Sequence, residues 1–446
     1  HRRPPPLWPP VYCDRARAEG RTPRMQRRAG LAGHERVKGI AQLWPEAGAT
    51  TIGAIASAAR SAAAGHLPAG ADEVKAYLAR LSHCLLMDKR ANGIPELQAL
   101  GFWLRRAAVE SMLKRYLAGF AAGPISGIVF QLPPSNVPTL FGYTAAIALL
   151  CGEVSVIRLS NAENSVQALL VTLIKETLKD ASASVRNRLF LLKYDHDDNV
   201  TEALSSLCSL RLVWGSDETV RHIAGLALPS TARHISFGDR FSAMALKASA
   251  YQALDGDGRE AVVRDAFNDI YMFDQLACAS PRLIIWVGTA EVTAESGEEF
   301  YTRLSDQANL RRYEPDIGGR LVKLNTSYLA LHDLRPVTYA VYGPSLSVIA
   351  LGNLKGLSGF KAVNYGYGTL LASRLVRLAD LAEDTEPRDQ TLACWGFDSD
   401  EIDGFVRAPR RSGFDRIVPL GQALTFDPVW DGCNLFEAMT RIKDKS

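Results

Sequence analysis

The stretch Phe273-Asp274-Gln275-Leu276-Ala277-Cys278-Ala279-Ser280-Pro281-Arg282-Leu283-Ile284-Ile285-Trp286-Val287 places one cysteine directly before a short apolar run. The run from Leu283 to Val287 consists of large apolar residues and follows Ser-Pro, which is typical of a buried strand. Residues 262–272 have helical spacing, so we expect Cys278 in a tight connection between a helix and a buried strand. Reactive groups are often carried on such loops, but free cysteines are also among the most buried residues. The local pattern leaves a reactive and a core cysteine equally open.

The chain has 446 residues, which is too long for one ordinary core and predicts two or more domains. Its apolar and charged fractions, 47% and 22%, are typical of globular proteins. We find no apolar run near the roughly 18 residues of a membrane span, and no secretory signal at the start. The seven cysteines are widely spaced without a Cys-x-x-Cys or Cys/His cluster, which argues against disulfides and zinc. We therefore expect a cytoplasmic protein without a metal.

Residues 1–24 are rich in Pro and Arg and have no apolar periodicity, so we expect a disordered tail. The tail has six Arg against Asp14 and Glu19, a balance of +4, while the whole chain carries +3, which leaves −1 for the rest. The basic character thus belongs to the tail and predicts no nucleic-acid partner. Such a tail can bind phosphate or membrane surfaces. We interpret it instead as an extension ahead of a natural start at Met25.

The next part of the chain changes texture at Gly127. From Ala41 to Phe120 we expect helices, at 54–64, 72–89 and 96–117, that cover a sheet. After Gly127 short apolar runs alternate with helical patterns, which predicts a parallel sheet covered on both faces. The expected strands are 128–132, 154–159, 188–192 and 210–214, and the expected helices are 138–150 and 165–178.

The pattern restarts at about Phe241 with the Cys278 unit, a helix near 290–304 and strands near 337–342 and 346–351. This predicts a second α/β domain. No Gly-x-Gly-x-x-Gly follows the first strand, and Gly366-Tyr367-Gly368 is only a fragment of that dinucleotide fingerprint. Cofactor binding must therefore be argued from other residues.

Three strand ends carry polar residues where α/β folds bind ligands. Pro133-Pro134-Ser135-Asn136-Val137-Pro138 offers the Asn136 amide, either as a helix cap or as a hydrogen-bond donor to a ligand. Arg158-Leu159-Ser160-Asn161 ends the next strand. Trp214-Gly215-Ser216-Asp217 is a Gly-Ser turn that can approach phosphate closely. Each signal is weak alone.

In this order the segments resemble the aldehyde dehydrogenase superfamily. Its Pro-x-Asn-x-Pro, Lys-Pro-Ser, Gly-Ser, Glu-Leu-Gly-Gly, cysteine and Phe-Gly-Pro signatures match Pro134–Pro138, Arg158–Ser160, Gly215-Ser216, Ser236–Asp239, Cys278 and Tyr342–Pro344. Three longer segments, 237–242, 275–282 and 415–421, are similar to the LuxC-type fatty acyl-CoA reductases. That family supplies long-chain aldehyde in bacterial bioluminescence. The resemblance covers about 122–441.

The resemblance implies a fold and a domain plan. The fold would be aldehyde dehydrogenase-like α/β, with a Rossmann-type cofactor domain and a second α/β catalytic domain. After the tail at 1–24, a helical layer and an NAD(P)-binding domain would span 25–240. The catalytic domain would span 241–425, followed by a C-terminal segment at 426–446.

The resemblance also implies a reaction. The Cys278 thiolate would attack an acyl thioester, with Asn136 and the Cys278 backbone N–H as the oxyanion hole. Reduced nicotinamide would then convert the acyl-enzyme to free aldehyde. The substrate would be acyl-CoA or an acyl-carrier thioester, with an acyl-transferring enzyme as a potential partner, and the protein would form homo-oligomers. The implied cofactor-binding residues are Pro134, Ser135, Arg158, Ser160, Asn161, Gly215, Ser216 and Gly238.

Cofactor choice depends on two of these positions. Arg158 stands where the superfamily commonly has Lys, and Asn161 where many NAD-preferring members have a ribose-binding Glu. A guanidinium without a neighbouring carboxylate suits a 2′-phosphate, because Arg can offer two parallel donors. We therefore predict NADPH. The alternative is that Arg158 only stacks under the adenine.

Two departures from the superfamily pattern bear on the reaction. The general-base Glu is replaced by Ser236, and a Glu that often grips the nicotinamide ribose is replaced by Ala340. His234 is the titratable group nearest to Ser236 in the sequence, and it is either a proton shuttle or a surface residue at a strand end. An ordinary aldehyde-oxidising dehydrogenase and a catalytically idle scaffold protein are the alternative functions. Ser236 argues against the first, and the presence of Cys278 and Asn136 argues against the second.

Overall fold

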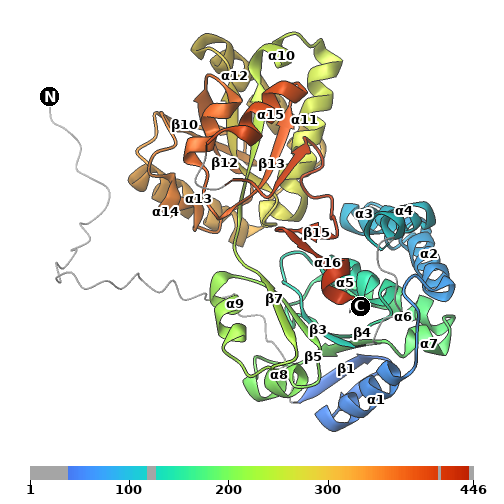
Figure 1. Cartoon of the computed structure of the whole chain (residues 1–446). Coiled ribbons are helices and arrows are strands. Elements are labelled where there is room, and N and C mark those ends of the chain that lie inside the picture. Colours follow the sequence, from blue (N-terminus) through green and yellow to red (C-terminus); the bar gives the residue numbers. More distant parts are fainter. Residues whose placement is uncertain (1–38, 118–126, 410–412, 441–446) are drawn as a thin grey trace, which may run out of the picture. The chain divides into compact units, whose positions relative to one another are not determined.

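The computed structural model describes residues 39–117, 127–409 and 413–440 (Figure 1). The predicted disorder of residues 1–24 and the start at Met25 lie outside the described residues. The described residues form one compact unit, which contains two seven-stranded sheets. The fold is the predicted α/β arrangement of two parallel-dominated sheets with helices.

The first sheet has the strand order β2-β1-β5-β4-β3-β6-β7. Its parallel strands are β3 (Ile128–Leu132), β4 (Val154–Arg158), β5 (Leu189–Lys193), β6 (Leu210–Trp214) and β7 (Arg233–Phe237). The first four confirm the predicted apolar runs. The prediction that only helices precede Phe120 is wrong, because β1 (Ile40–Trp44) and β2 (Gly48–Thr50) form an antiparallel edge on β5.

Helices cover both faces of this sheet. One face packs mainly on α2 (Asp72–Met87), α5 (Leu140–Leu150) and α6 (Ser165–Lys179), and the other on α1 (Ile52–Ala64) and α8 (Asp198–Ser205). The predicted single helix at 96–117 is two helices, because the backbone of Arg105, with ψ 143°, leaves the helical conformation. Leu104 is fully buried at the break. The remaining helices are α3 (Pro95–Trp103), α4 (Arg106–Tyr116), α7 (Ala183–Arg186) and α9 (Asp217–Ala224).

The second sheet has the order β10-β11-β12-β9-β8-β13-β14. All neighbouring strands are parallel except β10, which is antiparallel to β11. The strands are β8 (Phe241–Lys247), β9 (Pro281–Val287), β10 (Thr338–Tyr342), β11 (Leu346–Ala350), β12 (Thr369–Leu375), β13 (Asp389–Trp395) and β14 (Arg416–Pro419). The chain passes from β7 of the first sheet to β8 of the second through Gly238, Asp239 and Arg240.

The helices of the second sheet also form two layers. The first layer has α10 (Ala248–Gln252), α11 (Gly256–Tyr271) and α12 (Ala290–Leu310). The second has α13 (Ile317–Asp333), α14 (Leu357–Lys361), α15 (Ser399–Arg407) and the 3-10 helix η2 (Leu378–Asp384). A second 3-10 helix, η1 (Met272–Gln275), leads from α11 to the Cys278 loop.

The C-terminal segment leaves the second sheet and packs on helices of the first. It contains β15 (Val429–Trp430), β16 (Cys433–Asn434) and α16 (Leu435–Met439). The Trp103 indole donates to the Phe426 carbonyl at 3.0 Å, and the Tyr116 hydroxyl donates to Asp427 at 3.0 Å. The last strands of the chain therefore lie near the passage between the two sheets.

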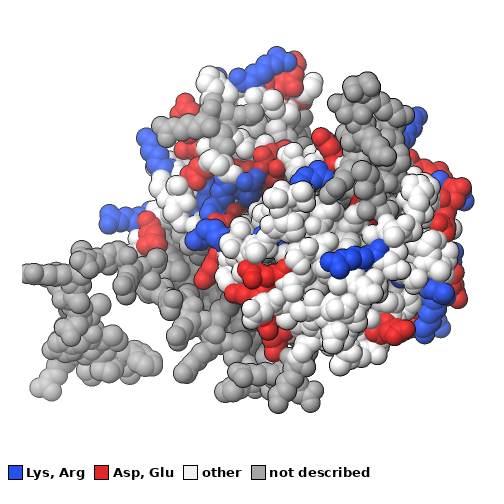
Figure 2. Space-filling model, turned by 60° about the horizontal axis from the view of Figure 1, so that its bottom comes forward, with Lys and Arg blue, Asp and Glu red and all other residues white. Residues whose placement is uncertain are grey.

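Among the described helices, none is both long and apolar enough to cross a bilayer. Figure 2 shows a face on which Lys and Arg are interspersed with Asp and Glu among neutral residues.

Candidate active site

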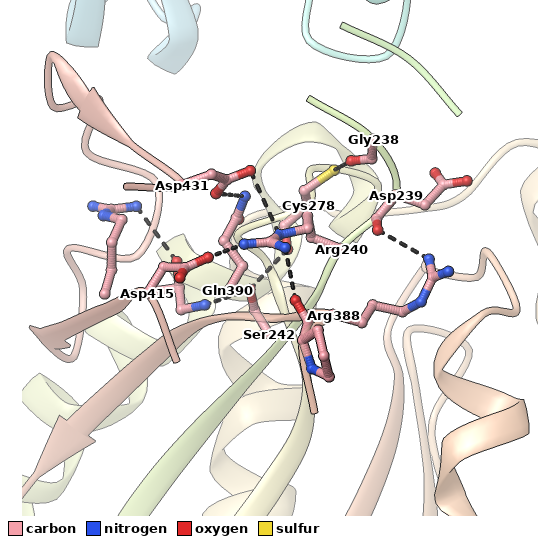
Figure 3. Close-up of polar contacts among 12 residues, drawn as sticks. Gly238, Asp239, Arg240, Ser242, Cys278, Arg388, Gln390, Asp415 and Asp431 are labelled. Atoms are coloured by element: carbon pink, nitrogen blue, oxygen red, sulfur yellow. Dashed lines mark hydrogen bonds and ion pairs between the residues drawn. The ribbon is translucent and has the colours of Figure 1, made fainter. Parts of the chain in front are cut away.

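Cys278 lies in the connection between η1 and β9, as its sequence position predicts. Its side chain is partly buried, and its Sγ lies 3.8 Å from the Gly238 carbonyl oxygen, to which it donates (Figure 3). Its own carbonyl accepts a hydrogen bond of 2.8 Å from Ser242 Oγ, which in turn accepts from the backbone N–H of Thr391 at 3.2 Å. The Cys278 carbonyl is therefore held by Ser242 of β8, whose hydroxyl is in turn fixed by Thr391 of β13.

The turn before Cys278 has an uncommon backbone. Phe273, Asp274 and Gln275 are three consecutive non-glycine residues with positive φ, at 56°, 54° and 62°. Left-handed backbone costs about 1–2 kcal/mol per residue, so other interactions must stabilise it. Gln275 supplies them: its amide donates to Pro281 O at 2.8 Å and Thr369 O at 3.0 Å, and accepts from Gly368 N and Thr369 N. The fully buried Gln275 thus fixes the turn to the start of β12.

The turn before Cys278 leaves no room for side chains at positions 366 and 368, where the sequence has glycine. A Cβ on Gly366 would lie 2.5 Å from the Asp274 carbonyl oxygen, and one on Gly368 would collide with the Ser345 carbonyl. Gly368 also has φ 75°, and the intervening Tyr367 N–H donates to Asp274 O at 2.8 Å. The Gly366-Tyr367-Gly368 segment packs against the Cys278 loop. Close packing therefore accounts for both glycines, and no role in dinucleotide binding is needed to explain them.

The passage between the sheets is braced beside the cysteine. Asp217 Oδ1 accepts from the Asp239 N–H at 3.0 Å, and Asp239 Oδ2 accepts from the Asp217 N–H at 3.1 Å. Arg388 donates to the Asp239 carbonyl at 2.9 Å and to Asp217 Oδ2 at 2.7 Å. Gly238 has no room for a side chain, since a Cβ there would lie 2.5 Å from Asp217 Oδ1. The Gly238 carbonyl is therefore held in place next to Cys278.

The groups around the Cys278 thiol have opposing effects on its pKa. Burial raises the pKa of Cys278 above its usual value, and nearby Asp239 and Asp431 raise it further. The Arg282 guanidinium and the backbone N–H of Arg240 lower the pKa of this cysteine. The raised pKa means that the thiol form dominates at neutral pH, and thiolate must be generated for chemistry.

Asn136, the predicted oxyanion-hole residue, lies beside the Cys278 loop. It follows β3, and its Nδ2 donates to the Leu276 carbonyl at 2.7 Å. An amide nitrogen carries two N–H groups, so the second donor remains for a ligand. Pro134 and Ser135 lie in the same connection, and Ser135 is exposed. The structure thus brings Asn136 and Cys278 to one place.

Arg158 and Asn161 lie together at the end of β4. Arg158 donates to the Tyr194 carbonyl at 3.3 Å and its guanidinium lies 5.0 Å from the Tyr194 ring centroid. Within the described residues Arg158 Nε has no hydrogen-bond partner. Asn161 Nδ2 donates to the exposed Asp195 at 2.9 Å, so a carboxylate that the sequence reasoning did not consider stands nearby.

The polar groups of Ser160, Ser216 and Gly215, the other predicted cofactor-binding residues at these strand ends, already form hydrogen bonds within the protein. Ser160 Oγ accepts from the Ala162 N–H at 3.1 Å. Ser216 Oγ accepts from the Thr219 N–H at 3.2 Å and caps α9, whose first turn carries Asp217 and Glu218. The Gly215 N–H donates to the Phe237 carbonyl at 3.1 Å.

His234 lies apart from Cys278. It is on β7, four residues before Gly238, which at about 3.3 Å per residue is about 13 Å along the strand. Its Nδ1 accepts from Arg211 Nε at 3.0 Å, and burial together with the Arg211 charge lowers the pKa of His234. Ser236 is exposed on the same strand. The structure does not bring His234 to the cysteine, and its predicted proton-shuttle role stays a prediction without geometric support.

Several residues around Cys278 were not predicted as site residues, namely Gln275, Arg240, Ser242, Arg282 and Arg388. Four of them lie within the segments that resemble the LuxC-type enzymes, so membership in those segments was the available signal. In the part of the chain that the structure describes, no group of three His, Cys, Asp or Glu residues could hold a metal ion.

Comparisons with known proteins agree with the fold and with the sequence resemblance. Residues 99–317 match the family described as acyl-CoA reductase (LuxC), which confirms that resemblance over this part of the chain. No curated protein sequence matches the chain.

Solved structures of aldehyde dehydrogenases have the same fold. An indole-3-acetaldehyde dehydrogenase in complex with NAD+ is 15% identical with a TM-score of 0.63, and 88% of each chain is covered. A Thermus 1-pyrroline-5-carboxylate dehydrogenase with bound NAD is 13% identical with a TM-score of 0.62, covering 88% of this chain and 84% of that one. A putative aldehyde dehydrogenase from Burkholderia cenocepacia is 16% identical with a TM-score of 0.59, covering 83% and 84%. The predicted aldehyde dehydrogenase-like fold is confirmed.

Proposed function

We propose, from the match of residues 99–317 to the LuxC acyl-CoA reductases, that this protein reduces a long-chain acyl thioester to the aldehyde. The acyl group would be carried on Cys278, and the reductant would be NADPH. The acyl donor would be coenzyme A, a carrier protein or an acyl-transferring partner enzyme. The observation that supports the proposal is the Cys278 loop, whose strained backbone is fixed by Gln275. Its Leu276 carbonyl accepts from Asn136, and its cysteine sulfur lies next to the Gly238 carbonyl.

The residues present fit a bound nicotinamide cofactor. Arg158 Nε and the Trp214 indole N–H, which lie at the carboxyl ends of β4 and β6, have no hydrogen-bond partner among the described residues. Parallel α/β sheets bind nucleotides at this edge. Arg158 would hold the adenosine 2′-phosphate, because it contacts no carboxylate directly, and the Gly215-Ser216 turn would lie near the diphosphate. The bound cofactor supplies a hydride to the acyl carbon.

The protein's own residues account for the other steps. The Cys278 thiolate attacks the thioester carbonyl, and the second N–H of Asn136 and the Cys278 N–H stabilise the negative oxygen. The C–S bond to the leaving thiol then breaks, and that thiolate takes a proton from water. After the acyl carbon has received the hydride, its bond to Cys278 Sγ breaks and releases aldehyde and thiolate. Overall, acyl thioester, NADPH and a proton give aldehyde, NADP+ and free thiol.

Labelling of the cysteine tests the proposal. The protein is incubated with radiolabelled palmitoyl-CoA without reductant, and NADPH oxidation is measured separately. The wild type should acquire label and oxidise NADPH, whereas Cys278→Ala should do neither and still bind cofactor. Cys208→Ala is the matched control, because burial raises the pKa of Cys208 to about 11 and makes it a poor nucleophile. Label that persists on Cys278→Ala would assign the nucleophile elsewhere.

A further inference from the structure

We infer that Arg240 is a positioning residue for Cys278: its side chain locks the passage between the sheets so that its backbone N–H points at the cysteine sulfur. The inference rests on the proposed role of Cys278 as nucleophile. It concerns a residue whose guanidinium does not touch the acyl group. The evidence is the set of contacts that hold the two ends of Arg240.

The backbone of the passage lies next to the sulfur, with the Gly238 carbonyl in contact with it. The Gly238 carbonyl accepts from the thiol at 3.8 Å, and the Arg240 N–H is the hydrogen-bond donor that favours the thiolate. The other charged groups that influence the sulfur are Arg282, which favours the thiolate, and Asp239 and Asp431, which oppose it. The carbonyl of this segment stabilises the thiol and its N–H stabilises the thiolate. The orientation of the segment therefore affects how easily the thiolate forms.

The guanidinium of Arg240 is clamped by three distant chain segments (Figure 3). It pairs with Asp415, donates to the Pro387 carbonyl at 2.7 Å, and its Nε lies 3.5 Å from Asp431 Oδ2. Asp431 is itself held by Gln390, whose amide donates to it at 2.7 Å. The backbone end is fixed too, because Arg282 donates to the Arg240 carbonyl at 3.3 Å.

The contacts that hold Arg240 can affect the chemistry of Cys278 as well as the packing of the passage. A peptide N–H stabilises a thiolate only while it points at the sulfur, and the passage between two sheets is a natural place for rotation. Arg suits the position because its planar fork can reach several oxygens at once, which Lys cannot. The C-terminal hairpin that carries Asp431 thereby influences the nucleophile without contacting substrate.

The test measures the thiol directly. Alkylation of Cys278 by iodoacetamide is followed by mass spectrometry of its peptide between pH 6 and pH 10.5. In the wild type the rate should rise with pH beyond pH 9, because only the thiolate reacts and the pKa of Cys278 is raised. In Arg240→Gln the backbone N–H is no longer held toward the sulfur, which should shift this profile upward by about one pH unit, a tenfold lower rate at pH 8.

Arg259→Gln is the matched control. Its side chain is 23% exposed against 20% for Arg240, and its guanidinium likewise donates to a carboxylate, Glu299 at 2.5 Å, and to a backbone carbonyl, Gln252 at 2.8 Å. Both variants should lose similar thermal stability, but Arg259→Gln should keep the wild-type pH profile. An Arg240→Gln profile equal to that of the control would overturn the inference.

Arg240→Lys separates the clamp from the charge. Lys keeps the positive charge but cannot reach Asp415, Asp431 and Pro387 together, so its profile should shift like that of Arg240→Gln. A wild-type profile in Arg240→Lys would assign the effect to charge and contradict the positioning role. NADPH-dependent turnover of the wild type is measured in parallel, so loss of the proposed function is recognised independently of these shifts.

Discussion

The loop that carries Cys278 and the strand ends that carry Arg158 and Asn161 differ in what holds their polar groups. In the loop, all four hydrogen-bonding positions of the Gln275 amide are used within the protein, and the glycines of the 366–368 segment fit against it. At the strand ends, Arg158 Nε and the Trp214 indole N–H are buried without a partner among the described residues.

This difference indicates that the protein alone positions the groups around the nucleophile, whereas the cofactor edge is completed by its ligand. Preorganised groups cost no reorganisation when the reaction takes place, which suits the nucleophile loop. Unpartnered buried donors cost free energy until a ligand accepts from them, which suits a cofactor edge that is completed by its ligand. Predictions about the loop should therefore concern chemical rates, and those about the strand ends should concern cofactor affinity.

The largest expected effect concerns the fate of the acyl-enzyme. Water needs a positioned carboxylate base, which contributes about 10²–10⁴-fold, and the sequence resemblance matches Ser236 to the superfamily's Glu. Thiols ionise more readily than water, so coenzyme A can attack the acyl-enzyme without such a base. Without NADPH, exchange of label with free coenzyme A should exceed release of fatty acid by at least about 10²-fold. The two products are quantified over time by chromatography, and rapid acid release would favour an aldehyde-oxidising enzyme.

The second effect isolates the oxyanion hole. Asn136→Ala should lower the rate of acylation by palmitoyl-CoA about 10²–10³-fold, the usual cost of losing one oxyanion donor. Its bond to the Leu276 carbonyl is lost as well, so loop disorder must be distinguished. Iodoacetamide alkylation of Cys278 makes this distinction, since it needs the thiolate but no oxyanion hole. A variant that loses both rates equally would indicate that Asn136 only fixes the loop.

The sequence predicted the elements whose signal is local. The apolar runs at β3, β4, β5 and β6 are short, buried and bounded by helical patterns, so periodicity was sufficient. The edge strands β1 and β2 were missed, because the segment contains Gly, Pro and Ala and its strand character comes from pairing with β5 far along the chain. Tertiary pairing decides such segments more than propensity does.

The candidate site shows the same division. Cys278 was placed between helix and strand from its immediate neighbours, and Asn136 from the strand end before it. The clamp on Arg240 could not be predicted, because Asp415 is 175 residues away and no spacing rule connects them. His234 was chosen for its nearness to Ser236 in the sequence, and residues two apart do share a face of a strand. Its ring is bound by Arg211, however, and Cys278 lies next to Gly238, beyond the end of β7.

The third effect tests the cofactor edge. Arg158→Leu should lower catalytic efficiency with NADPH about 10–100-fold, because a charged hydrogen bond is worth about 1.5–3 kcal/mol, and should affect NADH less than about threefold. Asp195→Asn should act in the opposite direction, since it removes the carboxylate that Asn161 binds and that would repel a 2′-phosphate. Initial rates at varied cofactor concentration give both ratios. Equal losses with NADPH and NADH would instead support stacking of Arg158 under the adenine.

The smallest effect concerns Ser216, whose hydroxyl either caps α9 or binds the cofactor. Its hydroxyl already accepts from the Thr219 N–H at 3.2 Å as the cap of α9. Ser216→Ala should therefore destabilise the protein by about 1 kcal/mol, the usual cost of an N-cap. Ser216→Asn, which can still cap the helix, should restore that stability. Because the hydroxyl is used within the protein, the KM for NADPH should change in neither variant by more than about threefold, a free energy of about 0.65 kcal/mol. A KM that rises tenfold in Ser216→Ala, with stability unchanged, would show that this hydroxyl belongs to the cofactor and that the strand ends are less complete than the Cys278 loop.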